Sequence, residues 1–235
     1  MDTLKTIKEE IGGISYVGRG IALGTSQNEK YSVIAYFIMG RSENSRNRVF
    51  AKDEDGTIFT KPYDESKVSD PSLIIYNAVR SMDGTIVVTN GNQTDTICRE
   101  IMCGNTFEAA LMMRGYEPDA PNFTPRISGI VHIDGNYRYK LSILKRSYGG
   151  GCNRFTYAYS PTAGVGHLIH TYNGDGSPLP SFSGEPRIIS VPDDIDLFTS
   201  EVWDALDGEN KISLYVRYTS LSDGTYTDRL INKYR

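Results

Sequence analysis

The stretch Tyr31-Ser32-Val33-Ile34-Ala35-Tyr36-Phe37-Ile38-Met39 decides the fold class of this 235-residue chain. β-Branched and aromatic residues dominate it, and such residues favour strands. Working outward along the chain, we expect further strands over 16–24, 57–59, 85–89, 127–133, 137–144, 155–159, 188–191 and 212–216. Asp55-Gly56 and Asp83-Gly84 are typical of hairpin turns and precede two of these strands. The sequence therefore predicts a chain built mainly from strands.

Helical periodicity is confined to a few segments. Apolar residues recur at helical spacing over 4–11, 97–102, 107–113 and 195–206. Asn105 and Glu108 have the spacing of a capping box for the third of these helices. Because strands and helices do not alternate strictly, a doubly wound parallel sheet is not expected. We predict one α+β domain, residues 1–235, with mostly antiparallel sheets.

Composition and charge exclude several classes of function. The formal net charge of −4 gives no general attraction to nucleic acid, so an anionic ligand must be held by a local cluster of Arg or Lys. No stretch approaches the ~20 apolar residues of a membrane span, and residues 1–7 lack the apolar run of a signal peptide. The three cysteines include no Cys-x-x-Cys pair. We expect a cytoplasmic protein without a disulfide framework, a membrane partner or a nucleic-acid partner.

Arg41-Ser42-Glu43-Asn44-Ser45-Arg46-Asn47-Arg48 directly follows the apolar strand. Three guanidiniums and two amides within eight residues can form a fork-shaped anion site at the end of a strand. A solvated hairpin tip that discourages pairing at a sheet edge explains the same composition. We expect Arg48 to lie outside the core, because it belongs to a polar cluster.

Two further segments combine groups suited to binding a polar ligand. Tyr76 and Asn77 offer a phenol and an amide, which can polarise a carbonyl oxygen; a core tyrosine with a satisfied hydroxyl is the alternative. Thr89-Asn90-Gly91-Asn92-Gln93-Thr94-Asp95-Thr96 joins a strand to a helix and can hold an anion or a sugar hydroxyl. Capping of the helix by Thr94 or Asp95 explains that segment equally well.

The remaining chemical candidates are a carboxylate and two histidines. Glu117 lies in a loop after a helix and Arg126 begins a strand behind Pro125, so the two can supply an acid–base group and a cation; a surface connection is the alternative. His167 and His170 are three residues apart, but no further ligand stands at a supporting distance in the sequence. We therefore predict no metal site.

Taken in order, six short blocks resemble the archaeal-type IMP cyclohydrolase family. They are Tyr16-Val17-Gly18-Arg19, Arg41-Ser42 to Asn47-Arg48, Tyr76-Asn77-Ala78-Val79-Arg80, Thr89-Asn90-Gly91 with Thr94-Asp95-Thr96, Tyr116-Glu117, and Thr124-Pro125-Arg126. The second block is two residues longer than the archaeal pattern, and 167–186 has no counterpart that we can place. That segment leaves open either a changed substrate or an added lid.

The resemblance implies both a fold and a reaction. The fold is a four-layer αββα sandwich like that of the N-terminal-nucleophile hydrolases. The reaction closes the ring of 5-formamidoimidazole-4-carboxamide ribotide (FAICAR) to inosine monophosphate (IMP) with loss of water, the last step of de novo purine synthesis. The family acts on a cyclic amidine bond of a purine ribotide without a metal or cofactor. We also expect a homo-oligomer.

The resemblance also implies roles for individual residues. Arg48 and Tyr76 would polarise the formyl oxygen, and Glu117 would orient or deprotonate the carboxamide. Arg19 and Arg126 are candidates for the ribotide phosphate. The candidates for holding the substrate's ribose or base are Asn47, Asn77, Asn90, Thr94 and Asp95.

Two other functions stay open from the sequence. An amide hydrolase of the N-terminal-nucleophile type needs Cys, Ser or Thr at its mature N-terminus, whereas Met1 is followed here by Asp2. A purine-nucleotide-binding module without catalysis would bind IMP and leave FAICAR unchanged.

Overall fold

The computed structural model describes residues 4–68, 75–133 and 136–234, and within these ranges the strands form two sheets. The six-stranded sheet has the order β11 (Arg187–Ser190), β10 (Val165–His170), β1 (Arg19–Thr25), β2 (Tyr31–Met39), β12 (Lys211–Ser220), β13 (Tyr226–Asn232). The seven-stranded sheet has the order β3 (Val49–Lys52), β4 (Ile58–Lys61), β5 (Asn77–Met82), β6 (Thr85–Thr89), β7 (Arg126–His132), β8 (Arg138–Arg146), β9 (Cys152–Tyr159). All neighbouring strands of both sheets pair antiparallel. The predicted α+β class with antiparallel sheets is confirmed.

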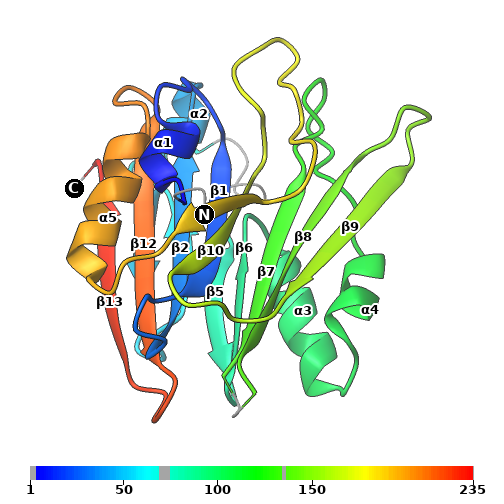
Figure 1. Ribbon diagram of the computed structural model, residues 1–235. Coiled ribbons are helices and arrows are strands. Elements are labelled where there is room, and N and C mark those ends of the chain that lie inside the picture. Colours follow the sequence, from blue (N-terminus) through cyan, green and yellow to red (C-terminus); the bar gives the residue numbers. More distant parts are fainter. Residues whose placement is uncertain (1–3, 69–74, 134–135, 235) are drawn as a thin grey trace.

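The two sheets pack face to face, and helices cover their outer faces (Figure 1). Helices α1 (Ile7–Ile11) and α5 (Ile195–Ala205) share an apolar core with the outer face of the six-stranded sheet. Helices α3 (Gln93–Met102) and α4 (Phe107–Met112) do the same on the seven-stranded sheet. Side chains from both sheets fill a third core between them.

Strand β2 is apolar at every position from Val33 to Met39 because both of its faces are buried. Val33, Ala35 and Phe37 point toward the helices α1 and α5, while Ile34 and Tyr36 point toward the other sheet. Successive side chains of a strand alternate between its two faces, so a strand between two cores needs apolar residues at every position. This is why residues 31–39 identify the fold class.

Some local predictions are confirmed and others are wrong. The Asp83-Gly84 turn joins β5 to β6, as predicted. The strand predicted from residue 16 begins only at Arg19, because Gly18 has a φ of +78° and a Cβ there would lie 2.1 Å from the hydroxyl of Thr171. The predicted capping box at Asn105 is also wrong: the side chain of Thr106 caps α4 instead.

Several loops converge at one end of the sandwich. The short helix α2 (Glu43–Arg46) follows β2 there, and the long loop between β10 and β11, yellow in Figure 1, rises beside it. A single 3-10 turn, η1 (Glu65–Lys67), precedes the undescribed residues 69–74. No helix among the described residues is long and apolar enough to cross a membrane.

Candidate active site

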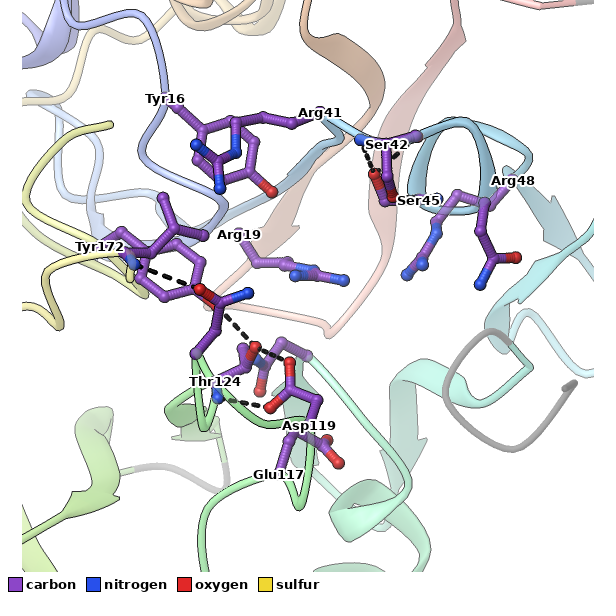
Figure 2. A pocket seen from close by; sticks show the side chains of 14 residues that line it. Tyr16, Arg19, Arg41, Ser42, Ser45, Arg48, Glu117, Asp119, Thr124 and Tyr172 are labelled. Atoms are coloured by element: carbon purple, nitrogen blue, oxygen red, sulfur yellow. Dashed lines mark hydrogen bonds between the residues drawn. The ribbon is translucent and has the colours of Figure 1, made fainter. Parts of the chain in front are cut away.

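A cavity of about 240 Å³ opens among these loops (Figure 2). It is lined by Tyr16, Arg19, Arg41, Ser42, Asn44, Ser45, Arg48, Asn90, Glu117, Asp119, Asn122, Thr124, Tyr172 and Leu179. Both sheets contribute to it, because these residues come from the start of β1, the α2 segment, the end of β6, the α4–β7 loop and the β10–β11 loop. Of the predicted site residues, the cavity brings together Arg19, Arg48, Asn90 and Glu117.

Arg48 and Arg19 are the main cationic groups inside the cavity. Arg48 is 3% exposed, so the prediction that it lies outside the core is wrong: it sits between α2 and β3, where the chain turns inward. Its Nε and Nη1 atoms, and Nε of Arg19, are buried and have no hydrogen-bond partner among the described residues. Burial, followed by the nearby positive charge of Arg19, lowers the pKa of Arg48 to about 10. Two guanidiniums, one buried and one partly buried, with unused donors are suited to binding an anionic or oxyanionic ligand.

Glu117 faces these cations from the α4–β7 loop and is held by Arg126. Nη2 of Arg126 donates to Oε2 of Glu117 at 2.9 Å, while Nη1 donates to Asn92 and Gln93 at 2.9 and 2.6 Å. Burial raises the pKa of Glu117, and the charge of Arg126 opposes that shift. Arg126 therefore orients a buried carboxylate, with both its terminal nitrogens engaged by protein.

The Glu117–Arg126 pair needs a glycine at position 91. A Cβ on Gly91 would lie 2.8 Å from Nη1 of Arg126 and 3.0 Å from Oε1 of Glu117. Contacts this short force the neighbouring side chains to move. The chain therefore passes close to the ion pair only because residue 91 has no side chain.

Gly91→Ala should displace the carboxylate and lower kcat by at least about tenfold, because misplacement of a positioning group by an ångström is costly. The matched control is Gly115→Ala, since a Cβ on Gly115 would meet nothing within 4 Å. Steady-state turnover of the two variants, with their melting temperatures, checks this expectation. Equal turnover in both variants would show that the position of Glu117 does not matter.

Asn90 and Thr94 stabilise the turn between β6 and α3. The amide nitrogen of Asn90 donates to the carbonyl of Pro125 at 2.9 Å, and its oxygen accepts from the backbone of Ile127 at 2.9 Å. The hydroxyl of Thr94 contacts the hydroxyl of Thr89 at 2.7 Å. Capping by Thr94 or Asp95 is not observed, because α3 begins at Gln93 and its N-cap residue makes no side-chain cap. Asn90 reaches the cavity with its amide already engaged, and Thr94 is not among the lining residues.

Three other predicted binding residues lie away from the cavity lining. Asn77 donates to Asp95 at 2.9 Å, and Arg80 donates to the same carboxylate oxygen. The amide of Asn47 is paired with the backbone of Asp64 in both directions, at 2.8 and 2.7 Å. These contacts hold neighbouring segments together.

Tyr76 stands directly before β5 and is not among the residues that line the cavity. Its hydroxyl lies 2.7 Å from the hydroxyl of Tyr36, and its ring belongs to the core between the sheets. In this structure Tyr76 therefore matches the alternative prediction, a core tyrosine whose hydroxyl has a partner.

Sequence reasoning missed the aromatic and acidic part of the lining. Tyr16 stacks on Tyr172 with ring centres 5.9 Å apart, and the guanidinium of Arg41 lies over Tyr16 and pairs with Asp175. Tyr172 and Asp175 belong to the segment 167–186, whose turn-rich part 172–178 the sequence predicts to be a connection or a lid, without a role for either side chain. The nearby His170 hydrogen-bonds the backbone of Tyr172 through Nδ1.

Within residues 4–68, 75–133 and 136–234, no group of three or more His, Cys, Asp or Glu side chains is arranged to hold a metal ion. The ring of His167 instead stacks on Tyr159, with centres 3.5 Å apart, and its Nδ1 lies 2.8 Å from the hydroxyl of Tyr139. The two histidines thus take part in packing and hydrogen bonds.

The chain is similar to known proteins over most of its length. A family model described as "IMP cyclohydrolase-like protein" matches residues 16–224. The IMP cyclohydrolase of Methanosphaera stadtmanae is 33% identical over 124 residues, which are 51% of this chain and 59% of that relative. That of Methanocaldococcus jannaschii is 34% identical over 118 residues, 49% of this chain and 56% of the relative.

The chain thus spans a little over half the length of these two relatives. The IMP cyclohydrolase of Methanopyrus kandleri aligns over more of the chain, at 28% identity over 170 residues, which are 71% of this chain and 79% of the relative. The family match over residues 16–224 contains the whole cavity lining, from Tyr16 to Leu179. The chain belongs to the IMP cyclohydrolase-like family.

Proposed function

We propose that the protein is an IMP cyclohydrolase, which closes FAICAR to IMP with loss of water. The observation that carries this assignment is that buried guanidinium nitrogens of Arg19 and Arg48 have no hydrogen-bond partner among the described residues and share a cavity with the held carboxylate of Glu117. A ribotide brings an anionic phosphate, and ring closure places negative charge on the former formyl oxygen. The phosphate and the developing oxyanion both need fixed cations nearby. The attraction between these charges is stronger in a buried site, from which water is excluded.

Within this function, each group has a role that its surroundings support. Arg48 stabilises the developing oxyanion, and the Tyr76 hydroxyl, which contacts that of Tyr36 in this structure, would have to turn toward the substrate to assist it. Arg19 is the candidate for the phosphate. Glu117 orients the carboxamide nitrogen for attack, and its raised pKa brings it closer to the range of a useful general base. Arg126 is better explained as the residue that positions Glu117 than as a phosphate ligand, because its terminal nitrogens are already engaged.

The remaining expectations belong to the same proposal. The order helices, sheet, sheet, helices supports a likeness to the N-terminal-nucleophile hydrolase fold. The alternative of an amide hydrolase depends on the residue at the mature N-terminus. Met1 and Asp2 lie outside the described residues. We further propose a single domain that acts in the cytoplasm as a homo-oligomer, without nucleic acid, metal or cofactor.

Purified protein should convert FAICAR to IMP, as followed by ultraviolet absorbance, and a chelator should leave the rate unchanged. The reason is that arginines and a carboxylate supply the charges that the reaction needs. Activity that is lost with chelator and restored by zinc would contradict the metal-free proposal. Tight binding of IMP without any turnover of FAICAR would favour a binding module instead.

A further inference from the structure

Three side chains on the cavity wall form a continuous chain of hydrogen bonds. Thr124 contacts the carboxylate of Asp119 twice: its backbone N–H donates to Oδ1 at 2.6 Å, and its hydroxyl donates to Oδ2. The hydroxyl of Thr124 also lies 2.5 Å from the hydroxyl of Tyr172. All three residues line the cavity, and Figure 2 shows them on the same side as Glu117.

The carboxylate fixes the direction of every hydrogen bond in this chain. An ionised Asp119 can only accept, so the single hydroxyl proton of Thr124 must point toward it. Thr124 can then only accept from Tyr172, so the hydroxyl proton of Tyr172 points toward Thr124. The phenol oxygen of Tyr172 is left with lone pairs alone to present to the cavity. A tyrosine that would ordinarily donate to a ligand is thereby set to accept from one.

We propose that Tyr172, Thr124 and Asp119 form a proton relay in which Tyr172 accepts a proton from the bound substrate; this rests on the proposed function. When a substrate N–H bond breaks, its proton passes to the Tyr172 oxygen and its electron pair stays on nitrogen. The Tyr172 proton passes to Thr124, and the Thr124 proton neutralises Asp119. The reverse sequence returns a proton to the hydroxyl that leaves as water. Tyr172 is a catalytic residue in this scheme, and Thr124 and Asp119 are positioning residues.

The surroundings of Tyr172 favour this assignment. Its side chain is 1% exposed, and it stacks on Tyr16, so its orientation is fixed. Burial raises its pKa to about 12, and the charge of Arg19 opposes that shift. A phenol with so high a pKa stays neutral at neutral pH. The relay keeps it neutral, because Tyr172 gives up its own proton as it accepts one and Asp119 takes up the proton at the end of the chain. Ring closure moves protons from nitrogen to oxygen, which is the transfer that such a chain can carry.

Asp119→Asn is the sharpest test because it keeps the shape and reverses the polarity. The backbone N–H of Thr124 needs an acceptor, so the oxygen of the new amide must take the place of Oδ1. The amide nitrogen then faces the Thr124 hydroxyl and donates to it. Thr124 must donate to Tyr172, and the Tyr172 proton is turned into the cavity. We expect kcat to fall by on the order of 10²-fold in Asp119→Asn and in Tyr172→Phe, with little change in KM.

The control is Tyr218→Phe, which also removes a buried hydroxyl, one that donates to the carbonyl of Pro192 at 2.8 Å on the far side of the six-stranded sheet. It should keep the wild-type kcat. A second readout needs no substrate: proton NMR of the free wild-type protein should show strongly downfield hydroxyl resonances, which short hydrogen bonds produce. Asp119→Asn should lose the resonance of the Thr124 hydroxyl bonded to the carboxylate, and Tyr172→Phe should lose that of the Tyr172 hydroxyl bonded to Thr124, whereas Tyr218→Phe should keep both.

The outcomes separate the relay from the proposed function. A wild-type protein that shows the resonances but never converts FAICAR would refute the proposed function and with it the role of the relay in ring closure, while leaving the hydrogen-bonded chain in place. Wild-type turnover without the resonances would refute the chain itself. Normal kcat in folded Tyr172→Phe would show that the three residues serve the structure only.

Discussion

Arg48→Met should abolish most of the activity and stabilise the fold at the same time. Arg48 is a buried cation whose Nε and Nη1 have no partner among the described residues, so it costs folding free energy. An unbranched apolar side chain of similar length removes that cost, and we expect the free energy of unfolding to rise by about 1 kcal/mol. If Arg48 stabilises the oxyanion, kcat should fall by on the order of 10²- to 10³-fold. Denaturant titration and steady-state kinetics on one preparation measure both effects.

Arg46→Met is the matched control for this experiment. Arg46 lies in the same block, but its guanidinium donates to the carbonyl of Gly40 and to Asn210, both at 3.0 Å. Its loss leaves those acceptors unsatisfied, so the fold should lose stability while turnover persists. If Arg48→Met also loses stability and keeps its kcat, Arg48 has a structural role and the anion site is elsewhere.

Tyr76→Phe should lower kcat by on the order of 10²-fold with a nearly unchanged KM. The substitution removes one hydroxyl and keeps the ring in the core between the sheets. If that hydroxyl donates to the forming oxyanion, its loss should raise the free energy of the transition state and leave substrate affinity nearly unchanged. Initial rates over a range of FAICAR concentrations separate the two parameters.

Tyr36→Phe controls for the structural part of that effect. Either variant breaks the 2.7 Å contact between the two hydroxyls, so each should lose about 1 kcal/mol of stability. Only Tyr76→Phe removes the hydroxyl assigned to the oxyanion, so Tyr36→Phe should keep most of its kcat. Equal losses of kcat in the two variants would mean that the pair acts through packing and that Tyr76 has no separate catalytic part.

The fold was predictable where burial leaves a strong pattern in the sequence. Strand β2 was recognised because both of its faces are apolar, and the Asp83-Gly84 turn because few residues suit a tight hairpin. Strand β13 was missed, since it is an edge strand of mostly polar, partly exposed residues with no alternation to detect. The α4 cap was misplaced by one residue because Asn105 and Thr106 both suit an N-cap.

The site was predictable only where its residues lie in recognisable blocks. Arg19, Arg48 and Glu117 reach the cavity from blocks that resemble the family. Tyr172 meets Thr124 from 48 positions along the chain, a contact that only the packing of the two sheets creates. Asn77 and Asp95, two polar residues in neighbouring blocks, hydrogen-bond to each other outside the cavity lining. Local composition identifies polar residues but not their partners.

Nuclear magnetic resonance with FAICAR carrying ¹³C in the formyl group tests the central claim most directly, since it follows the reacting carbon itself. With the wild-type protein, the formyl signal should be replaced by that of C2 of IMP, without another labelled product. With Arg48→Met at the same concentration, the same replacement should be at least about 10²-fold slower. A formyl signal that persists with the wild-type protein, or that appears as free formate, would contradict the assignment of this cavity to ring closure.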